Sequence, residues 1–208
     1  MDAVAGDQEW LRLNLSVMSG NLIRTFIALE VPEEVKKQIR LAQEHLHKVG
    51  SARVAWVKPN GIHLTLAFLG DVEENNLPDL IRLVGDCSAS HRPFSLIITA
   101  TGAFPGFNNP RVLWLGVEGG FSLVQLQSDV EMNLVRSGFM KPEKRFHPHL
   151  TLGRVKSFDR GSLLSSQTRS YVFKEVRWEA VEVRVMSSEL KPSGAEYAVL
   201  AALVLGQK

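Results

Sequence analysis

The tetrapeptide His-Leu-Thr-Leu occurs twice in this chain, at residues 63–66 and again at residues 149–152. In an extended strand successive side chains point to opposite faces, so the histidine and threonine share one face and the two leucines share the other. Each copy is therefore typical of a strand that rests its leucines on an apolar core and presents an imidazole and a hydroxyl in front. Two such strands facing one cleft would supply two imidazoles and two hydroxyls, which suit acid–base chemistry on a phosphate.

The elements around the two copies predict an α+β fold, because strands and helices are intermixed and joined by short links. Strands are predicted at residues 22–29, 54–57, 62–69, 94–101, 112–117, 148–155, 172–178, 181–190 and 196–205. Helical spacing of apolar residues predicts helices from Pro32 to Gly50, over residues 77–84 and over residues 123–134. The mostly polar residues 161–170 are expected to form a surface loop. The natural architecture is two half-molecules, each built around one copy of the tetrapeptide.

The chain divides into an N-terminal extension of unknown role, residues 1–21, and a single bilobal domain, residues 22–208. Leu11, Leu13, Leu15 and Val17 alternate with polar residues, a pattern that fits either an extra edge strand or a dispensable tail. No low-complexity stretch or flexible linker separates the two halves of the larger part.

Charge and cysteine content exclude some classes of protein. The net charge of +2 is too small to argue for nucleic-acid binding by itself. Five basic residues nevertheless bracket the second tetrapeptide, as a binding rim or as an ordinary solvated strand edge: Lys141, Lys144, Arg145, Arg154 and Lys156. The single cysteine, Cys87, excludes an intrachain disulfide and fits a reducing cytosol. With no membrane-length apolar run and no signal-peptide pattern, we expect a cytoplasmic protein.

Paired histidines suit catalysis at neutral pH, because the unperturbed imidazole pKa lies near neutrality. One neutral imidazole takes a proton from the attacking water, and one imidazolium gives a proton to the leaving oxygen. Thr65 and Thr151 would donate hydrogen bonds to the non-bridging phosphate oxygens. This chemistry requires no metal or other cofactor. His147 and His149 could instead share a metal ion, but no carboxylate stands at a recognisable ligand spacing.

These motifs resemble those of the 2H phosphoesterase superfamily, and in particular its LigT-like RNA 2′,3′-cyclic phosphodiesterases, also called 2′-5′ RNA ligases. The resemblance runs from about Ile23 to the C-terminus, and the first twenty or so residues depart from the family pattern. The segments that carry it are Arg24–Leu29 with Pro32, Trp56–Pro59, His63–Gly70, Phe104–Pro105, Pro110–Trp114, Phe146–Arg154, Ser188–Leu190 and Gly194–Tyr197.

The resemblance implies two similar lobes, each an antiparallel sheet with helices outside, related by a pseudo-two-fold axis and facing each other across the active-site cleft. It implies metal-independent hydrolysis of a 2′,3′-cyclic phosphate to a 2′-phosphate. By position, His63 matches the family's proton donor and His149 matches its proton acceptor. Phe68 matches a base-stacking position, and Arg154 a phosphate-binding position.

Two of these residues have a structural alternative. Phe68 could simply belong to the core. Arg154 shares the alternation of Leu152 rather than that of Thr151, so a regular strand would aim it away from the cleft. Only a twist or a bulge at the strand end would turn its side chain inward.

The leading hypothesis is thus an RNA 2′,3′-cyclic 3′-phosphodiesterase that acts on RNA 3′ ends or cyclic nucleotides. A 2′-5′ phosphodiesterase or reversible 2′-5′ RNA ligase would use the same acid and base, because ligation is the reverse of cleavage. An RNA-end-binding module and a metal hydrolase are the alternatives from other classes. We expect a monomer with no membrane contact and no obligate protein partner.

Overall fold

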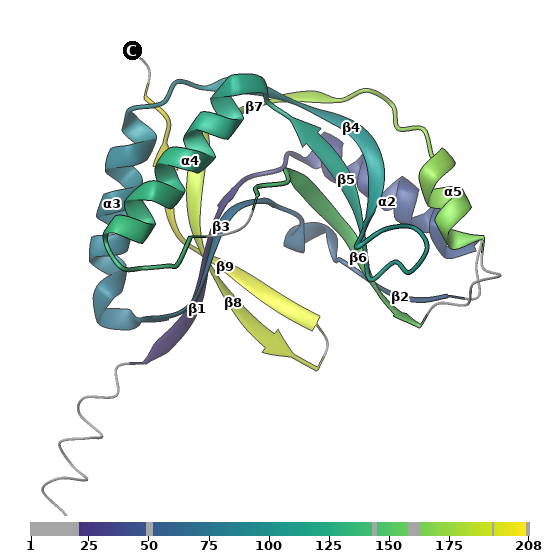
Figure 1. The fold of residues 1–208 in the computed structure, drawn as a ribbon, viewed down its shortest axis with the longest axis horizontal. Coiled ribbons are helices and arrows are strands. Elements are labelled where there is room, and N and C mark those ends of the chain that lie inside the picture. Colours follow the sequence, from purple (N-terminus) through teal and green to yellow (C-terminus); the bar gives the residue numbers. More distant parts are fainter. Residues whose placement is uncertain (1–20, 49–51, 143–144, 158–162, 193, 207–208) are drawn as a thin grey trace, which may run out of the picture.

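The protein folds into two lobes that lie side by side, each an antiparallel β-sheet with helices on its outer face (Figure 1). The computed structural model describes residues 21–48, 52–142, 145–157, 163–192 and 194–206. The strands are β1 (Leu22–Leu29), β2 (Arg53–Trp56), β3 (Leu64–Glu73), β4 (Phe94–Phe104), β5 (Val112–Glu118), β6 (His149–Ser157), β7 (Arg177–Ala180), β8 (Glu182–Lys191) and β9 (Gly194–Val204). The helices are α2 (Glu33–Lys48), α3 (Leu77–Ala89), α4 (Gly120–Arg136) and α5 (Leu164–Ser170), with 3₁₀ turns η1 (Pro59–Gly61) and η2 (Glu74–Asn76).

The two sheets share one arrangement of strands. The first sheet has the order β3-β1-β8-β9, and the second has the order β2-β6-β5-β4-β7. All neighbouring strands are antiparallel. The order β3-β1-β8-β9 of the first sheet matches the order β6-β5-β4-β7 of the second, with one tetrapeptide at the first strand of each, and leaves β2 as an added edge strand. The α+β fold with two similar antiparallel lobes, predicted from the sequence, is therefore confirmed.

Each lobe is assembled from both halves of the chain. The C-terminal strands β8 and β9 complete the first sheet, whereas β2 from the first half extends the second sheet. The helices cross over in the same way (Figure 1). Helix α2 follows β1 but packs behind the second sheet, and α4 follows β5 but packs with α3 behind the first sheet.

Apolar spacing places the helices as expected. The buried residues Val35, Ile39, Ala42 and Leu46 of α2 recur on one face, which faces the core. Two glutamates in the first turn favour the start of that helix through its dipole. The longest described helix, α4, has 17 residues, and none of the described helices is long and apolar enough to cross a membrane.

Two predicted elements are wrong. The expected surface loop at residues 161–170 contains helix α5, because Leu164 and Thr168 lie one turn apart and are both buried. The Oγ1 of Thr168 donates a 2.7 Å hydrogen bond to the Leu164 carbonyl. Of the strand expected at residues 172–178, only Arg177 and Trp178 belong to a strand, as the first residues of β7, while Tyr171 and Phe173 meet edge-on with ring centroids 4.7 Å apart. The alternating pattern at residues 11–17 lies outside the described residues.

Candidate active site

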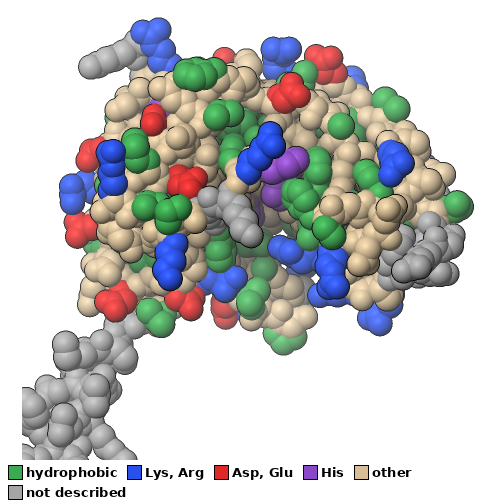
Figure 2. Space-filling view, viewed as in Figure 1, with side chains coloured by type: hydrophobic (Ala, Val, Ile, Leu, Met, Phe, Trp, Pro, Cys, Tyr) green, Lys and Arg blue, Asp and Glu red, His purple; other side chains and the backbone are tan. Residues whose placement is uncertain are grey.

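Both tetrapeptides open onto one pocket between the lobes, with a volume of about 370 Å³. All six residues expected from the sequence line it: His63, Thr65, Phe68, His149, Thr151 and Arg154. The remaining lining residues are Arg24, Phe26, Val57, Gly61, Ile62, Ser188, Leu190, Ala195 and Tyr197. Figure 2 shows histidine side chains in the hollow at the centre of the face, with lysine and arginine side chains beside them.

A β-bulge in β6 turns Arg154 into this pocket. Leu152 has no partner in the register with β5, because its neighbours Thr151 and Gly153 pair with consecutive residues of that strand. Such an extra residue shifts the inside–outside alternation beyond it. Leu152 and Gly153 are accordingly both buried, and Arg154 returns to the face of Thr151. The condition under which Arg154 could face the pocket is thus met.

The first tetrapeptide contains the same bulge. Leu66 lacks a partner on β1, because Thr65 and Ala67 pair with consecutive residues there. Leu66 and Ala67 are both buried, and Phe68 faces the pocket with 39% of its surface exposed. Phe68 therefore presents an aromatic face to the pocket instead of filling the core.

The backbone fixes the ring orientation of His149. Its Nδ1 lies 2.7 Å from the carbonyl oxygen of His147, and a carbonyl only accepts, so Nδ1 carries the proton. Nε2 of neutral His149 is then left to accept a proton. The edge of the Phe104 ring supports the imidazole, with centroids 5.1 Å apart.

His63 lies in a more apolar setting. Its ring stacks on Phe26 at 4.5 Å between centroids and meets Tyr197 edge-on at 5.1 Å. Burial lowers the pKa of His63 to about 4, partly offset by a backbone hydrogen bond at Gly61, and the charge of nearby His149 lowers it further. Burial also lowers the pKa of His149. Both imidazoles are therefore neutral at pH 7, and a phosphate anion beside them would raise both pKa values.

Arg24 and Tyr197 are among the nine lining residues that were not identified individually from the sequence. Arg24 places its guanidinium carbon 4.7 Å from the centroid of the Phe68 ring, a cation–π contact. Tyr197 reaches the pocket from β9, near the other end of the chain. Both occur in segments that carry the family resemblance. Placing them at the site, however, required knowing that β3, β1, β8 and β9 lie side by side.

The basic residues around the second tetrapeptide lie on the surface where they are described, and the two neighbouring histidines lack further metal ligands among the described residues. Lys141, Arg145 and Lys156 are exposed, and Lys144 lies outside the described residues. The His147 and His149 rings are 6.3 Å apart between centroids. Within the described part of the chain, no three His, Cys, Asp or Glu side chains are grouped so that they could hold a metal ion.

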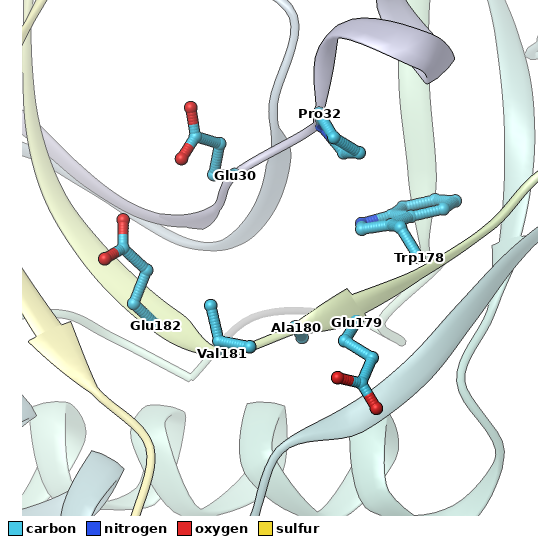
Figure 3. A pocket seen from close by; sticks show the side chains of 7 residues that line it. All are labelled: Glu30, Pro32, Trp178, Glu179, Ala180, Val181 and Glu182. Atoms are coloured by element: carbon cyan, nitrogen blue, oxygen red, sulfur yellow. The ribbon is translucent and has the colours of Figure 1, made fainter.

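A second hollow, of about 250 Å³, is acidic (Figure 3). It is lined by Glu30, Pro32, Trp178, Glu179, Ala180, Val181 and Glu182. Arg184 pairs with two of these carboxylates, those of Glu30 and Glu182. A phosphate would be repelled here, whereas the pocket lined by Arg24 and Arg154 would attract it. Of these two hollows, the one that contains both tetrapeptides is therefore the better fit for a phosphate.

Comparison with known proteins decides the family. The model of the family described as LigT like Phosphoesterase matches residues 29–114 and 117–197. The chain belongs to the LigT-like phosphoesterases. Among curated relatives of this phosphoesterase, the RNA 2′,3′-cyclic phosphodiesterase of Thermotoga maritima is 36% identical over 184 residues, covering 86% of this chain and 93% of the relative. That of Methanothermobacter thermautotrophicus is 35% identical over 178 residues, covering 84% and 95%.

Solved structures agree with this assignment. A Thermus thermophilus protein matches with a TM-score of 0.75 and 30% identity, over 89% of this chain and all of that one (100%). Escherichia coli LigT in complex with 3′-AMP matches with a TM-score of 0.70 and 25% identity, over 90% and 100%. The family resemblance drawn from the sequence is confirmed.

Proposed function

We propose that this phosphoesterase hydrolyses 2′,3′-cyclic phosphates at RNA ends or on nucleotides to 2′-phosphates, without a metal. The curated relatives that it matches over nearly their whole length carry the name of this activity. The observation that carries the proposal is the pocket between the lobes, because His63 and His149 of the two equivalent tetrapeptides both line it. A binding module would not need this paired acid and base.

In the proposed reaction His149 is the base and His63 is the acid. Nε2 of His149 takes a proton from water, whose oxygen attacks the phosphorus. The bond between phosphorus and O3′ breaks, and protonated His63 gives its proton to O3′. The product keeps its phosphate on O2′, and solvent returns the two histidines to their starting protonation states.

The remaining pocket residues suit the substrate's charge and base. Arg154 and Arg24 offset the phosphate charge, and the hydroxyls of Thr65 and Thr151 donate to its non-bridging oxygens. Phe68 offers its exposed face to a nucleobase. The complex of Escherichia coli LigT with 3′-AMP supports a site of nucleoside monophosphate size.

Substrate binding also resolves an electrostatic conflict in this mechanism. A proton donor must be protonated, yet burial lowers the pKa of His63 to about 4. The phosphate anion raises that pKa by stabilising the imidazolium. His63 therefore takes up its proton as substrate binds.

The product isomer from 2′,3′-cyclic AMP tests the proposal directly. We expect adenosine 2′-phosphate to form at an undiminished rate in excess chelator. The 3′ isomer would mean that O2′ is the leaving group and would reverse the proposed orientation. A requirement for added zinc or magnesium would contradict the metal-free mechanism, and absence of turnover would favour a binding module.

A further inference from the structure

Two glutamine side chains are buried behind the motif strands. Gln43 of α2 and Gln127 of α4 are 9% and 6% exposed, although both sit among core leucines and valines. A buried amide is destabilising unless its hydrogen bonds are made. The two glutamines occupy related positions, because each lies on the helix that precedes one motif strand and packs behind the sheet of the other.

Each glutamine binds the carbonyl of the last leucine of a tetrapeptide. The Nε2 of Gln43 donates to the Leu152 carbonyl at 2.9 Å and to the Val57 carbonyl at 2.9 Å. The Nε2 of Gln127 donates to the Leu66 carbonyl at 3.4 Å and to the Glu131 carboxylate at 2.7 Å. Each tetrapeptide is thus held from behind by a helix from the opposite half of the chain.

Leu66 and Leu152 are the bulged residues. Because a bulge interrupts the ladder, its backbone groups need partners from elsewhere. The Leu152 carbonyl accepts the Val57 N–H at 3.0 Å and the Gln43 amide as a second donor, and the Leu66 carbonyl accepts the Gln127 amide. A regular strand would point the fifth residue after the histidine away from the pocket.

We propose that Gln43 and Gln127 are positioning residues that stabilise the two bulges and so aim Arg154 and Phe68 at the substrate. This inference rests on the proposed function only for its kinetic readout. Gln43 acts on Arg154 through Leu152, and Gln127 acts on Phe68 through Leu66. Neither glutamine lines the pocket, so neither touches the substrate.

Replacement by methionine tests the inference, because it keeps the unbranched shape and removes the donor. In Gln43→Met we expect KM for 2′,3′-cyclic AMP to rise roughly 10–100-fold, the loss of a hydrogen bond to a charged partner. Combined with Arg154→Ala, Gln43→Met should add nothing, since both remove the same contact. Gln127→Met should likewise raise KM, and combined with Phe68→Ala it should add nothing. Matched controls on the same helices, Gln38→Met and Gln125→Met, should leave KM unchanged.

A merely structural role predicts a different result: a lower melting temperature, unchanged KM per folded molecule, and additive double mutants. Crystal structures of the two methionine variants decide the inference even if 2′,3′-cyclic AMP is not a substrate. It is overturned if Leu152 and Leu66 remain bulged with Arg154 and Phe68 in the pocket.

Should Gln43→Met fail to fold, Gln43→Glu keeps the shape and donates only while protonated. Its KM, relative to that of the unaltered protein at each pH, should approach the normal value at low pH and rise as the carboxyl ionises. A KM ratio that does not change with pH would overturn the assignment of Gln43.

Discussion

The two pocket histidines, His63 and His149, share a motif but not an environment. His149 is held by a carbonyl and an aromatic edge, whereas His63 lies against Phe26 and Tyr197. Burial is the leading cause of the lowered pKa at both, with a value of about 4 for His63. The tetrapeptide therefore decides which atoms face the pocket, and the surroundings decide how strongly each imidazole holds its proton.

Removing either imidazole should abolish most of the activity and leave the fold intact. We expect His63→Ala and His149→Ala each to lower the turnover of 2′,3′-cyclic AMP roughly 10²–10⁴-fold, the range for one general acid or base. The double variant should lose less than the product of both effects, because the acid and base act as a unit. Near-normal turnover in either folded variant would remove that histidine from the mechanism.

The lowered pKa of His63 also links stability to pH. The unfolded chain holds a proton on this histidine up to about pH 6.5, and the folded protein only below about 4. The neutral His63 ring therefore contributes to the free energy of unfolding above pH 6.5. This contribution is lost as pH falls toward 4, because the unfolded chain takes up the proton first. In His63→Asn the loss of stability between pH 7 and pH 4 should be smaller by up to about 3 kcal/mol. Urea unfolding across this range measures it, and parallel curves for both proteins would contradict the expectation.

Substitution of the two threonines tests whether the tetrapeptides form a functional site or merely supply β-branched residues to a strand. Thr65→Val and Thr151→Val preserve shape and delete one donor each. Loss of one preorganised donor should lower the rate by up to about 10²–10³-fold. The melting temperature should change little, because both side chains face the pocket. A large drop in melting temperature with unaltered turnover would mean that the hydroxyls serve only the fold.

At the scale of elements, periodicity predicted most of the strands and helices but not their irregularities. Alternation in each tetrapeptide correctly placed the histidine and threonine on one face. It could not reveal the bulges at Leu66 and Leu152, because a bulge is a relation between two strands and no single strand encodes it. For the same reason, the sequence could predict that Arg154 points into the pocket only on the condition that the strand is twisted or bulged. Helix α5 was missed because two buried positions, Leu164 and Thr168, are too few to show a period.

A close contact between neighbouring strands supports the site beside His149. The Trp114 ring of β5 lies directly on Gly102 of β4, where an added Cβ would come within 2.0 Å of Cζ2. Gly102→Ala should therefore destabilise the protein by about 1–3 kcal/mol, as overpacking does. It should also lower turnover, because Trp114 contacts the rings of His147 and His149.

Gly106→Ala is the matched control for this substitution. Nothing lies within 4 Å of the Cβ that it would add, so neither stability nor turnover should fall. Denaturant midpoints and kcat of both variants test the contact. Equal stability of the two alanine variants would show that Trp114 moves aside without loss.

At the scale of the whole molecule, the sequence correctly suggested two half-molecules but not how they are exchanged. The first sheet needs β8 and β9 from the C-terminal part, and the second needs β2 and the cover of α2 from the N-terminal part. The sequence assigned each tetrapeptide to its own half. It could not show the exchange, because local periodicity carries no information on which sheet a helix covers. The pocket itself exists only between the completed lobes.

This exchange of strands and helices predicts that the lobes unfold together. Trp56, Trp114 and Trp178 lie on β2, β5 and β7, so in a Trp10→Phe protein fluorescence reports the second sheet, while far-ultraviolet circular dichroism reports both. In urea the two signals should give one coincident transition. Gly102→Ala, although confined to the second sheet, should shift both midpoints equally. Two separate transitions would instead mean that each lobe is stable without the other, and that the crossing helices contribute little to holding the pocket together.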